Sequence, residues 1–185
     1  IINMRIIRVF PRKTKATPDD ENVRIDCTPG MFDVADEVHL SVSFSEDVPR
    51  AEYLAKQWGP VAPVKIGGPA YNDKGNGFVP GMYLKPGYII TSRGCPNNCW
   101  FCDAWKREGR TIRELPVSEG YNVLDNNLLA CSRGHQEKVF DMLSRQSKKA
   151  MFTGGLEAAR FTEWHAEQFQ RLKPQTYAFA YDEPA

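Results

Sequence analysis

Three cysteines within eight residues carry the strongest chemical signal in this sequence. Cys95, Cys99 and Cys102 have C-x₃-C-x₂-C spacing, and the Pro-Asn-Asn of residues 96–98 between the first two is typical of a loop. Three thiolates at this spacing can bind one face of a cubane iron–sulfur cluster and leave the fourth iron without a protein ligand. A metal with an open coordination position can take part in chemistry, whereas a fully ligated one is structural. The spacing therefore predicts a reactive metal centre.

The cysteine segment resembles the cluster-binding motif of the radical S-adenosylmethionine (SAM) superfamily. The family pattern is C-x₃-C-x-Φ-C with an aromatic residue at Φ, and Phe101 stands at that position. The resemblance implies a [4Fe–4S] cluster on the three cysteines, with SAM on the free iron and Phe101 near its adenine. It also implies reductive cleavage of SAM to a 5′-deoxyadenosyl radical that abstracts hydrogen from a substrate, which the sequence does not identify. A flavodoxin- or ferredoxin-type protein would donate the electron.

A non-catalytic module that binds zinc or an iron–sulfur cluster for structure is the alternative interpretation. In the zinc form, Cys131 or His135 would be the fourth ligand. Structural zinc ligands usually come as two spaced pairs, whereas here three cysteines lie together and the fourth candidate is distant in sequence. The spacing therefore favours the cluster.

Two further segments resemble SAM-binding motifs of the same superfamily. Leu124 and Asp125, followed by Asn126 and Asn127, resemble the hydrophobic–Asp–Asp motif of cobalamin-associated members. The resemblance implies that these polar side chains hydrogen-bond the amino group of SAM. An Asx-rich turn explains the same residues equally well.

The second segment is Gly154-Gly155-Leu156-Glu157, which resembles the family's Gly-Gly-Glu motif with one inserted residue. The resemblance implies that Gly154, Gly155 and Glu157 line the SAM site. The alternative is that the glycines only end a strand. No residue is assigned a catalytic role.

The elements that must position these residues alternate between strand and helix periodicity. An alternating stretch at 38–44, an amphipathic stretch at 47–58 and a short strand at 64–66 predict a parallel βαβ unit. After Pro86 we expect four strands and two helices: strands at 88–91, 122–129, 150–153 and 176–181, and helices at 135–146 and 162–172. This order predicts an α/β fold. The resemblance implies an incomplete (β/α) barrel of radical SAM type, with about four of the family's six strands.

We expect three regions along the chain. Residues 1–70 form a small Rossmann-like α/β region, within which 11–29 is polar and irregular; residues 71–86, rich in Gly and Pro, form a linker; residues 87–185 form the barrel. The first region is similar to the end of the cobalamin-binding domains that precede many radical enzymes. It lacks the Asp-x-His-x-x-Gly motif that supplies a histidine to cobalt, which makes cobalamin doubtful.

Composition limits the classes of partner. The 185 residues contain 24 Lys and Arg and 23 Asp and Glu, for a net charge of +1. This balance gives no electrostatic reason to expect nucleic acid or an anionic membrane. No apolar run approaches the roughly 20 residues of a membrane span, and an odd number of cysteines argues against a secreted disulfide framework. The expected location is the cytoplasm.

Overall fold

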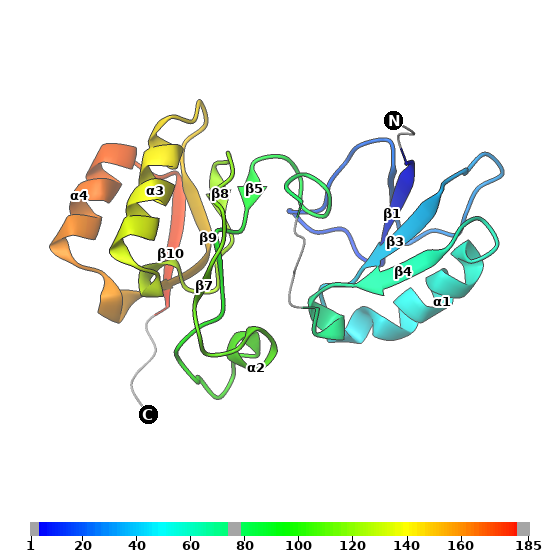
Figure 1. Cartoon of the computed structure of the whole chain (residues 1–185), viewed down its shortest axis with the longest axis horizontal. Coiled ribbons are helices and arrows are strands. Elements are labelled where there is room, and N and C mark those ends of the chain that lie inside the picture. Colours follow the sequence, from blue (N-terminus) through cyan, green and yellow to red (C-terminus); the bar gives the residue numbers. More distant parts are fainter. Residues whose placement is uncertain (1–3, 74–78, 181–185) are drawn as a thin grey trace. The chain divides into compact units, whose positions relative to one another are not determined.

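The chain divides into two compact units, residues 1–85 and 86–185 (Figure 1). The computed structural model describes residues 4–73 and 79–180, so residues 74–78 of the expected linker and the last five residues lie outside the described part. Each unit contains a four-stranded sheet in which all strand pairs are parallel. The predicted α/β class is confirmed.

Unit 1 is a parallel sheet in the order β2-β1-β3-β4. Its elements are β1 (Ile6–Phe10), β2 (Val23–Ile25), β3 (Glu37–Ser41), α1 (Val48–Trp58) and β4 (Val64–Gly67). Pro49 lies in the first turn of α1, where its missing N–H costs nothing, and Leu54 and Trp58 are fully buried against the sheet. The β3–α1–β4 segment corresponds to the predicted βαβ unit.

The sequence patterns did not indicate β1 and β2. Four of the five residues of β1 are buried, on both faces of the sheet, so its sequence shows no alternation of apolar and polar residues. β2 has only three residues, all partly exposed, and lies inside the stretch 11–29 that was expected to be irregular. That expectation was wrong for residues 23–25, because pairing with β1 imposes the strand rather than any local pattern.

The described end of the expected linker packs against unit 1. The Lys85 amide donates to the Ala16 carbonyl at 2.9 Å, and the Tyr83 hydroxyl lies 2.6 Å from Nδ1 of His39. Arg8 also donates to the Met82 carbonyl at 2.9 Å. Residues 79–85 are therefore attached to the sheet of unit 1 by hydrogen bonds on several strands and loops.

Unit 2 is a parallel sheet in the order β10-β9-β8-β5. Its main elements are β5 (Tyr88–Ile89), β8 (Asn122–Val123), α3 (Arg133–Ser144), β9 (Met151–Glu157), α4 (Glu163–Leu172) and β10 (Thr176–Ala180). These strands lie side by side in chain order, and α3 and α4 cover the same face of the sheet (Figure 1). Because neighbouring strands are parallel, each connection between them crosses over to the opposite end of the sheet.

An aromatic cluster joins the two helices of unit 2 to the sheet. Phe140 on α3 is fully buried, and its ring meets Phe152 on β9 and Trp164 and Phe169 on α4 at edge angles. Such edge-to-face pairs contribute about 0.5–1.5 kcal/mol each beyond burial. The cluster therefore fixes α3 and α4 over β9.

Three strands of unit 2 differ in length from the prediction. β5 ends at Ile89, although the pattern predicts a strand to residue 91. β8 ends at Val123 although the pattern predicts a strand to residue 129, and the polar residues 125–127 form the turn that follows. β9 continues to Glu157, through the Gly154-Gly155 pair at which we expected it to end. Glycine permits the continuation because the chain there passes directly against the backbone of residues 124–126.

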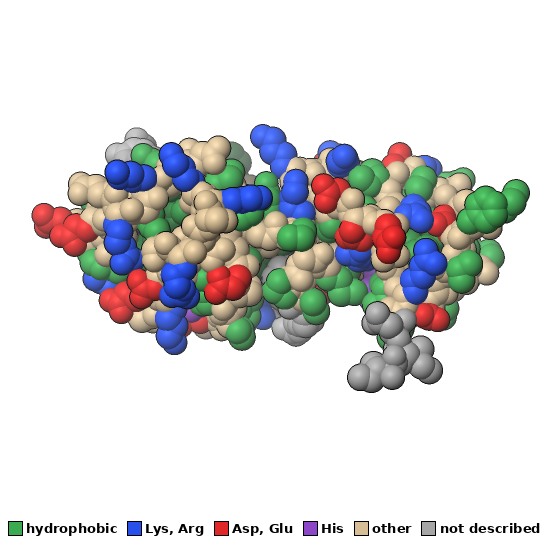
Figure 2. Space-filling view, turned by 90° about the horizontal axis from the view of Figure 1, so that it is seen from above, with side chains coloured by type: hydrophobic (Ala, Val, Ile, Leu, Met, Phe, Trp, Pro, Cys, Tyr) green, Lys and Arg blue, Asp and Glu red, His purple; other side chains and the backbone are tan. Residues whose placement is uncertain are grey.

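The surface carries both signs of charge. On the face shown in Figure 2, basic and acidic side chains are interspersed with apolar ones on each unit. Within residues 4–73 and 79–180, no helix combines the length and hydrophobicity needed to cross a membrane.

Candidate metal centre and cofactor site

The three cysteines lie in a loop whose two ends are joined by a short antiparallel ladder. β6 (Ser92–Arg93) pairs with β7 (Arg113–Glu114), and the Leu115 amide donates to the Thr91 carbonyl at 2.9 Å. Gly94 has φ of 90°, and a Cβ on it would collide with the Thr111 carbonyl oxygen. Glycine is therefore required where the loop begins.

A buried carboxylate stabilises the β6–β7 ladder at the ends of the loop. Glu108, at the end of α2 (Ala104–Glu108), accepts hydrogen bonds from Arg93 at 3.3 Å and from Arg113 at 3.1 Å. Its side chain is 6% exposed. One acid thus ties the two strands of the ladder to the short helix inside the loop. Sequence analysis missed this role, because a single acid between two arginines has no distinctive spacing.

Backbone hydrogen bonds shape the cysteine segment itself. The Cys102 amide donates to the Cys99 carbonyl at 3.1 Å, and Nε1 of Trp105 donates to the same carbonyl at 3.0 Å. Arg110 donates to the Pro96 carbonyl at 3.1 and 3.2 Å. Hydrogen bonds within the loop therefore contribute to its shape.

The three cysteine side chains are partly exposed, as are the aromatic residues between them. Trp100 is 84% exposed and Phe101 58% exposed, with their rings in edge contact at 5.6 Å. Exposed aromatic rings beside a metal loop offer an apolar surface to a ligand.

One group of potential metal ligands converges elsewhere in unit 2. Within the described residues, Asp125, Cys131 and His135 bring three potential ligand atoms of His, Cys, Asp or Glu to within 4.8 Å of one another. The cysteines of the loop do not belong to this group.

Residues from three neighbouring strands meet beside Cys95. Nδ2 of Asn127, after β8, lies 2.7 Å from Oε2 of Glu157 at the end of β9, and 3.7 Å from Sγ of Cys95. Asn126 accepts a hydrogen bond from the Gly94 amide at 3.2 Å. The strands β5, β8 and β9 are parallel neighbours, so the segments that follow them gather at one edge of the sheet, where ligands bind in open parallel sheets.

Glu157 carries a negative charge in this group. Burial raises the pKa of its carboxyl, but hydrogen bonds from Asn127 and Arg160 outweigh that effect and bring the pKa below its usual range. Arg160 donates through Nε to Oε2 of Glu157 at 2.6 Å. Asn97 in the cysteine loop also hydrogen-bonds this carboxylate, a contact that the sequence did not indicate. The charged group therefore lies against both the loop and the end of β8.

Asp125 lies apart from the other predicted residues. Its side chain points into unit 2, and the residue is 1% exposed. Oδ1 accepts from the Thr91 amide at 2.6 Å, and Oδ2 accepts from the hydroxyls of Thr91 at 2.6 Å and Ser92 at 2.7 Å. Burial raises the pKa of Asp125 against the opposing effect of these hydrogen bonds. The observed role is to hold the start of the cysteine loop to β8.

The two predicted glycines allow β9 to approach β8 closely. A Cβ on Gly154 would lie 2.6 Å from the carbonyl carbon of Leu124 and 2.7 Å from the Asp125 nitrogen, and one on Gly155 would collide with the Asn126 carbonyl oxygen. Neither Gly154 nor Gly155 could therefore be replaced by a residue with a side chain without moving the backbone. This approach brings Glu157 alongside Asn127.

Unit 1, in which the sequence made cobalamin doubtful, contains one histidine and a small cavity. Its one histidine, His39, has Nδ1 2.6 Å from the Tyr83 hydroxyl and Nε2 2.8 Å from Oε2 of Glu37, so both ring nitrogens are engaged. A cavity bounded by Phe10, Ser41 and their neighbours, at the carboxyl ends of β1 and β3, has a volume of about 70 Å³. Ligand pockets usually measure about 300–1,000 Å³. This cavity is smaller than a typical ligand pocket.

Neither the models of known protein families nor the sequences of curated proteins give a match to this chain.

Proposed function

We propose that this chain is a radical SAM protein in which Cys95, Cys99 and Cys102 would hold a [4Fe–4S] cluster. The observation that carries the proposal is the meeting of Asn127 and Glu157 beside Cys95, at the carboxyl edge of three parallel strands. A metal loop alone fits many proteins. A metal loop beside a charged carboxylate and an amide, at the edge where ligands bind, fits a metal that works on a bound cofactor.

The fold supports the same proposal at a finer level. In unit 2 each main strand lies beside the next one in the chain, and the helices cover one face. This is how a (β/α) barrel winds, so we assign unit 2 to part of a radical SAM barrel. When bound, the cluster and SAM supply the radical chemistry: one electron cleaves SAM to methionine and a 5′-deoxyadenosyl radical, which abstracts hydrogen from a substrate.

The residues of this chain have separate tasks. Glu157 presents a negative charge that would accept hydrogen bonds from the ammonium group of SAM, which is cationic. Asn127 holds that carboxylate through Nδ2 and directs the same amide toward Sγ of Cys95. Hydrogen bonds to cysteine sulfur are one of the factors that set the reduction potential of a cluster. Phe101 offers an exposed ring that would stack on adenine.

Anaerobic reconstitution with iron and sulfide tests the proposal. We expect the full chain to bind about four irons per chain, and the reduced cluster's electron paramagnetic resonance spectrum to change when SAM is added. Replacing Cys95, Cys99 or Cys102 singly with Ala should prevent assembly, whereas Cys27→Ala in unit 1, the matched control, should not.

The opposing result is a colourless protein that takes up no iron but holds zinc through the loop. Loss of that zinc in the single loop variants would assign the loop to a structural zinc site and refute the cluster. This readout depends on binding and spectroscopy and does not require turnover of a substrate.

A further inference from the structure

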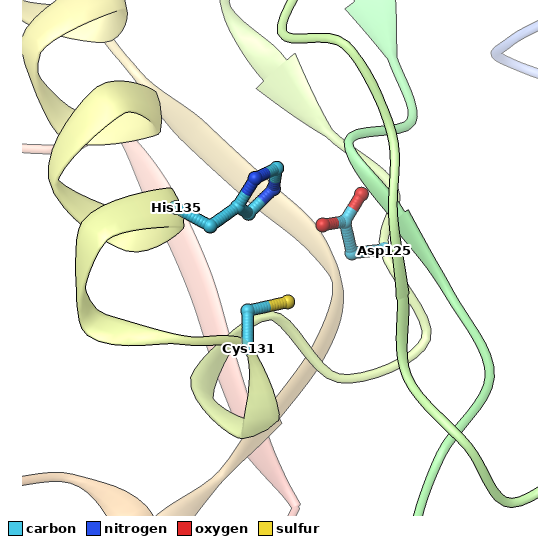
Figure 3. Close-up of side chains that lie close together, drawn as sticks. All are labelled: Asp125, Cys131 and His135. Atoms are coloured by element: carbon cyan, nitrogen blue, oxygen red, sulfur yellow. The ribbon is translucent and has the colours of Figure 1, made fainter.

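A second group of ligand-type side chains lies inside unit 2, separate from the cysteine loop. Asp125, Cys131 and His135 converge on one point, with a potential ligand atom of each within 4.8 Å of the others (Figure 3). The three residues are 1%, 7% and 6% exposed. Cys131 directly precedes the N-cap of α3 and His135 lies in its first turn, so the helix start places both side chains toward Asp125.

The histidine has one nitrogen without a partner. Nε2 of His135 is buried and has no hydrogen-bond partner within the described residues. Nδ1 lies 3.9 Å from Oε2 of Glu114. A metal-bound histidine typically directs its other ring nitrogen to a carboxylate, and this fixes the tautomer that turns a lone pair toward the metal. An unsatisfied buried polar atom costs about 1–3 kcal/mol, which a metal bond at Nε2 would remove.

The carboxylate of Asp125 is held as a metal ligand commonly is. The Thr91 amide and the hydroxyls of Thr91 and Ser92 orient it, and hydroxyl hydrogens can rotate away to free an oxygen. Among the described residues, Asp125 forms no ion pair with a lysine or arginine. A buried carboxylate without a cationic partner is costly, and a divalent ion would supply the missing charge.

We propose that Asp125, Cys131 and His135 bind a single zinc ion at a site distinct from the cysteine loop. One thiolate, one imidazole and one carboxylate are ligands that zinc accepts and that magnesium and calcium do not prefer as a set. Zinc bond lengths give ligand separations of about 3.3–3.6 Å, so small side-chain rotations close the group around the ion. Binding releases the proton of the Cys131 thiol.

A surface cavity borders one member of the group, His135. It measures about 410 Å³ and is lined by His135 together with Leu115, Pro116 and Lys138, among other residues. A water molecule would complete the tetrahedron as the fourth ligand. The bound ion would tie the end of β8 to the start of α3, and thereby brace the turn that carries Asn127.

The test uses a protein without the three loop cysteines, so that metal binding by the loop does not contribute to the measurement. In a background of Cys95→Ala, Cys99→Ala and Cys102→Ala, the full chain is stripped with a chelator and titrated with zinc, and with cobalt(II) as a coloured probe. We expect one ion per chain and a thiolate-to-cobalt charge-transfer band. Adding Cys131→Ser should abolish the band, and His135→Gln should weaken binding at least tenfold; Cys27→Ser, the matched control, should change neither.

Two results would overturn the proposal. One is a background protein that binds no zinc or cobalt although circular dichroism shows it folded. The other is X-ray absorption of the zinc-loaded background protein that shows no sulfur ligand, a measurement that applies even when the Cys131 variant does not fold. Because the background lacks the loop cysteines, these outcomes are independent of whether the intact chain assembles an iron–sulfur cluster.

Discussion

Replacing Gly154 with alanine should separate β9 from the end of β8. The new Cβ would lie 2.6 Å from the carbonyl carbon of Leu124 and 2.7 Å from the nitrogen of Asp125, whereas ordinary contacts begin at 3.4 Å. The carbonyl oxygen of Asp125 would lie closer still, so the two segments must move apart by more than about 0.8 Å, and all three neighbouring atoms belong to the backbone, which cannot rotate away. Overpacking of this kind costs about 1–3 kcal/mol, and we expect the upper end of that range.

Urea unfolding followed by circular dichroism measures this cost. With a slope of about 2 kcal/mol per molar urea, a loss of about 3 kcal/mol lowers the midpoint by about 1.5 M. Gly134→Ala is the matched control, since Gly134 lies in α3 with nothing within 4 Å of a new Cβ. Alanine should stabilise that helix by up to about 1 kcal/mol. If both variants shift the midpoint equally and in the same direction, the close approach of β9 to β8 does not exist.

Two further predictions concern charged groups in unit 2. Burial, followed by the nearby Arg133, lowers the pKa of His165 below 6.5, so its stabilising effect is complete above pH 6.5 and is lost as the pH falls toward the lower folded value. The urea midpoint should fall between pH 7.5 and pH 5.5, and fall less in His165→Gln; an equal fall in both proteins would contradict this. Glu108→Ala leaves two arginines without their acid, and limited proteolysis should then cut residues 94–112 faster than in the parent chain. Unchanged cleavage there would mean that Glu108 does not hold the ladder.

The two helices of unit 2 could be predicted because their buried residues recur at helical spacing. Val139, Phe140 and Leu143 lie on the inner face of α3, as their spacing indicates. β1 and β2 show no such periodicity. β1 is buried on both faces, and β2 is only three residues long. The strands β6 and β7 could not be predicted from the sequence either, because each has only two residues and no periodicity can be recognised in two residues.

The candidate site was predictable as a set of segments, but not in the direction of each side chain. Parallel strands end at a common edge, so the segments after β5, β8 and β9 were expected to meet. Whether a polar side chain after a strand points to that edge or into the interior depends on one backbone turn. Asn127 points to the edge and Asp125 points inward, although they are only two residues apart. Sequence spacing assigns both to the same motif.

The pairing of β6 with β7 at the two ends of the cysteine loop affects the iron concentration at which a cluster could form. Bringing together the ends of a flexible loop of about 20 residues costs about 2.5 kcal/mol. In this chain the pairing of β6 with β7 already holds the two ends of the loop together in the folded protein. The free energy of metal binding is therefore not reduced by the entropy lost on closing the loop. An energy of this size corresponds to about a 60-fold difference in affinity. Under the proposed function, the closed loop would bind iron at a concentration well below the one that an open peptide with the same cysteines requires.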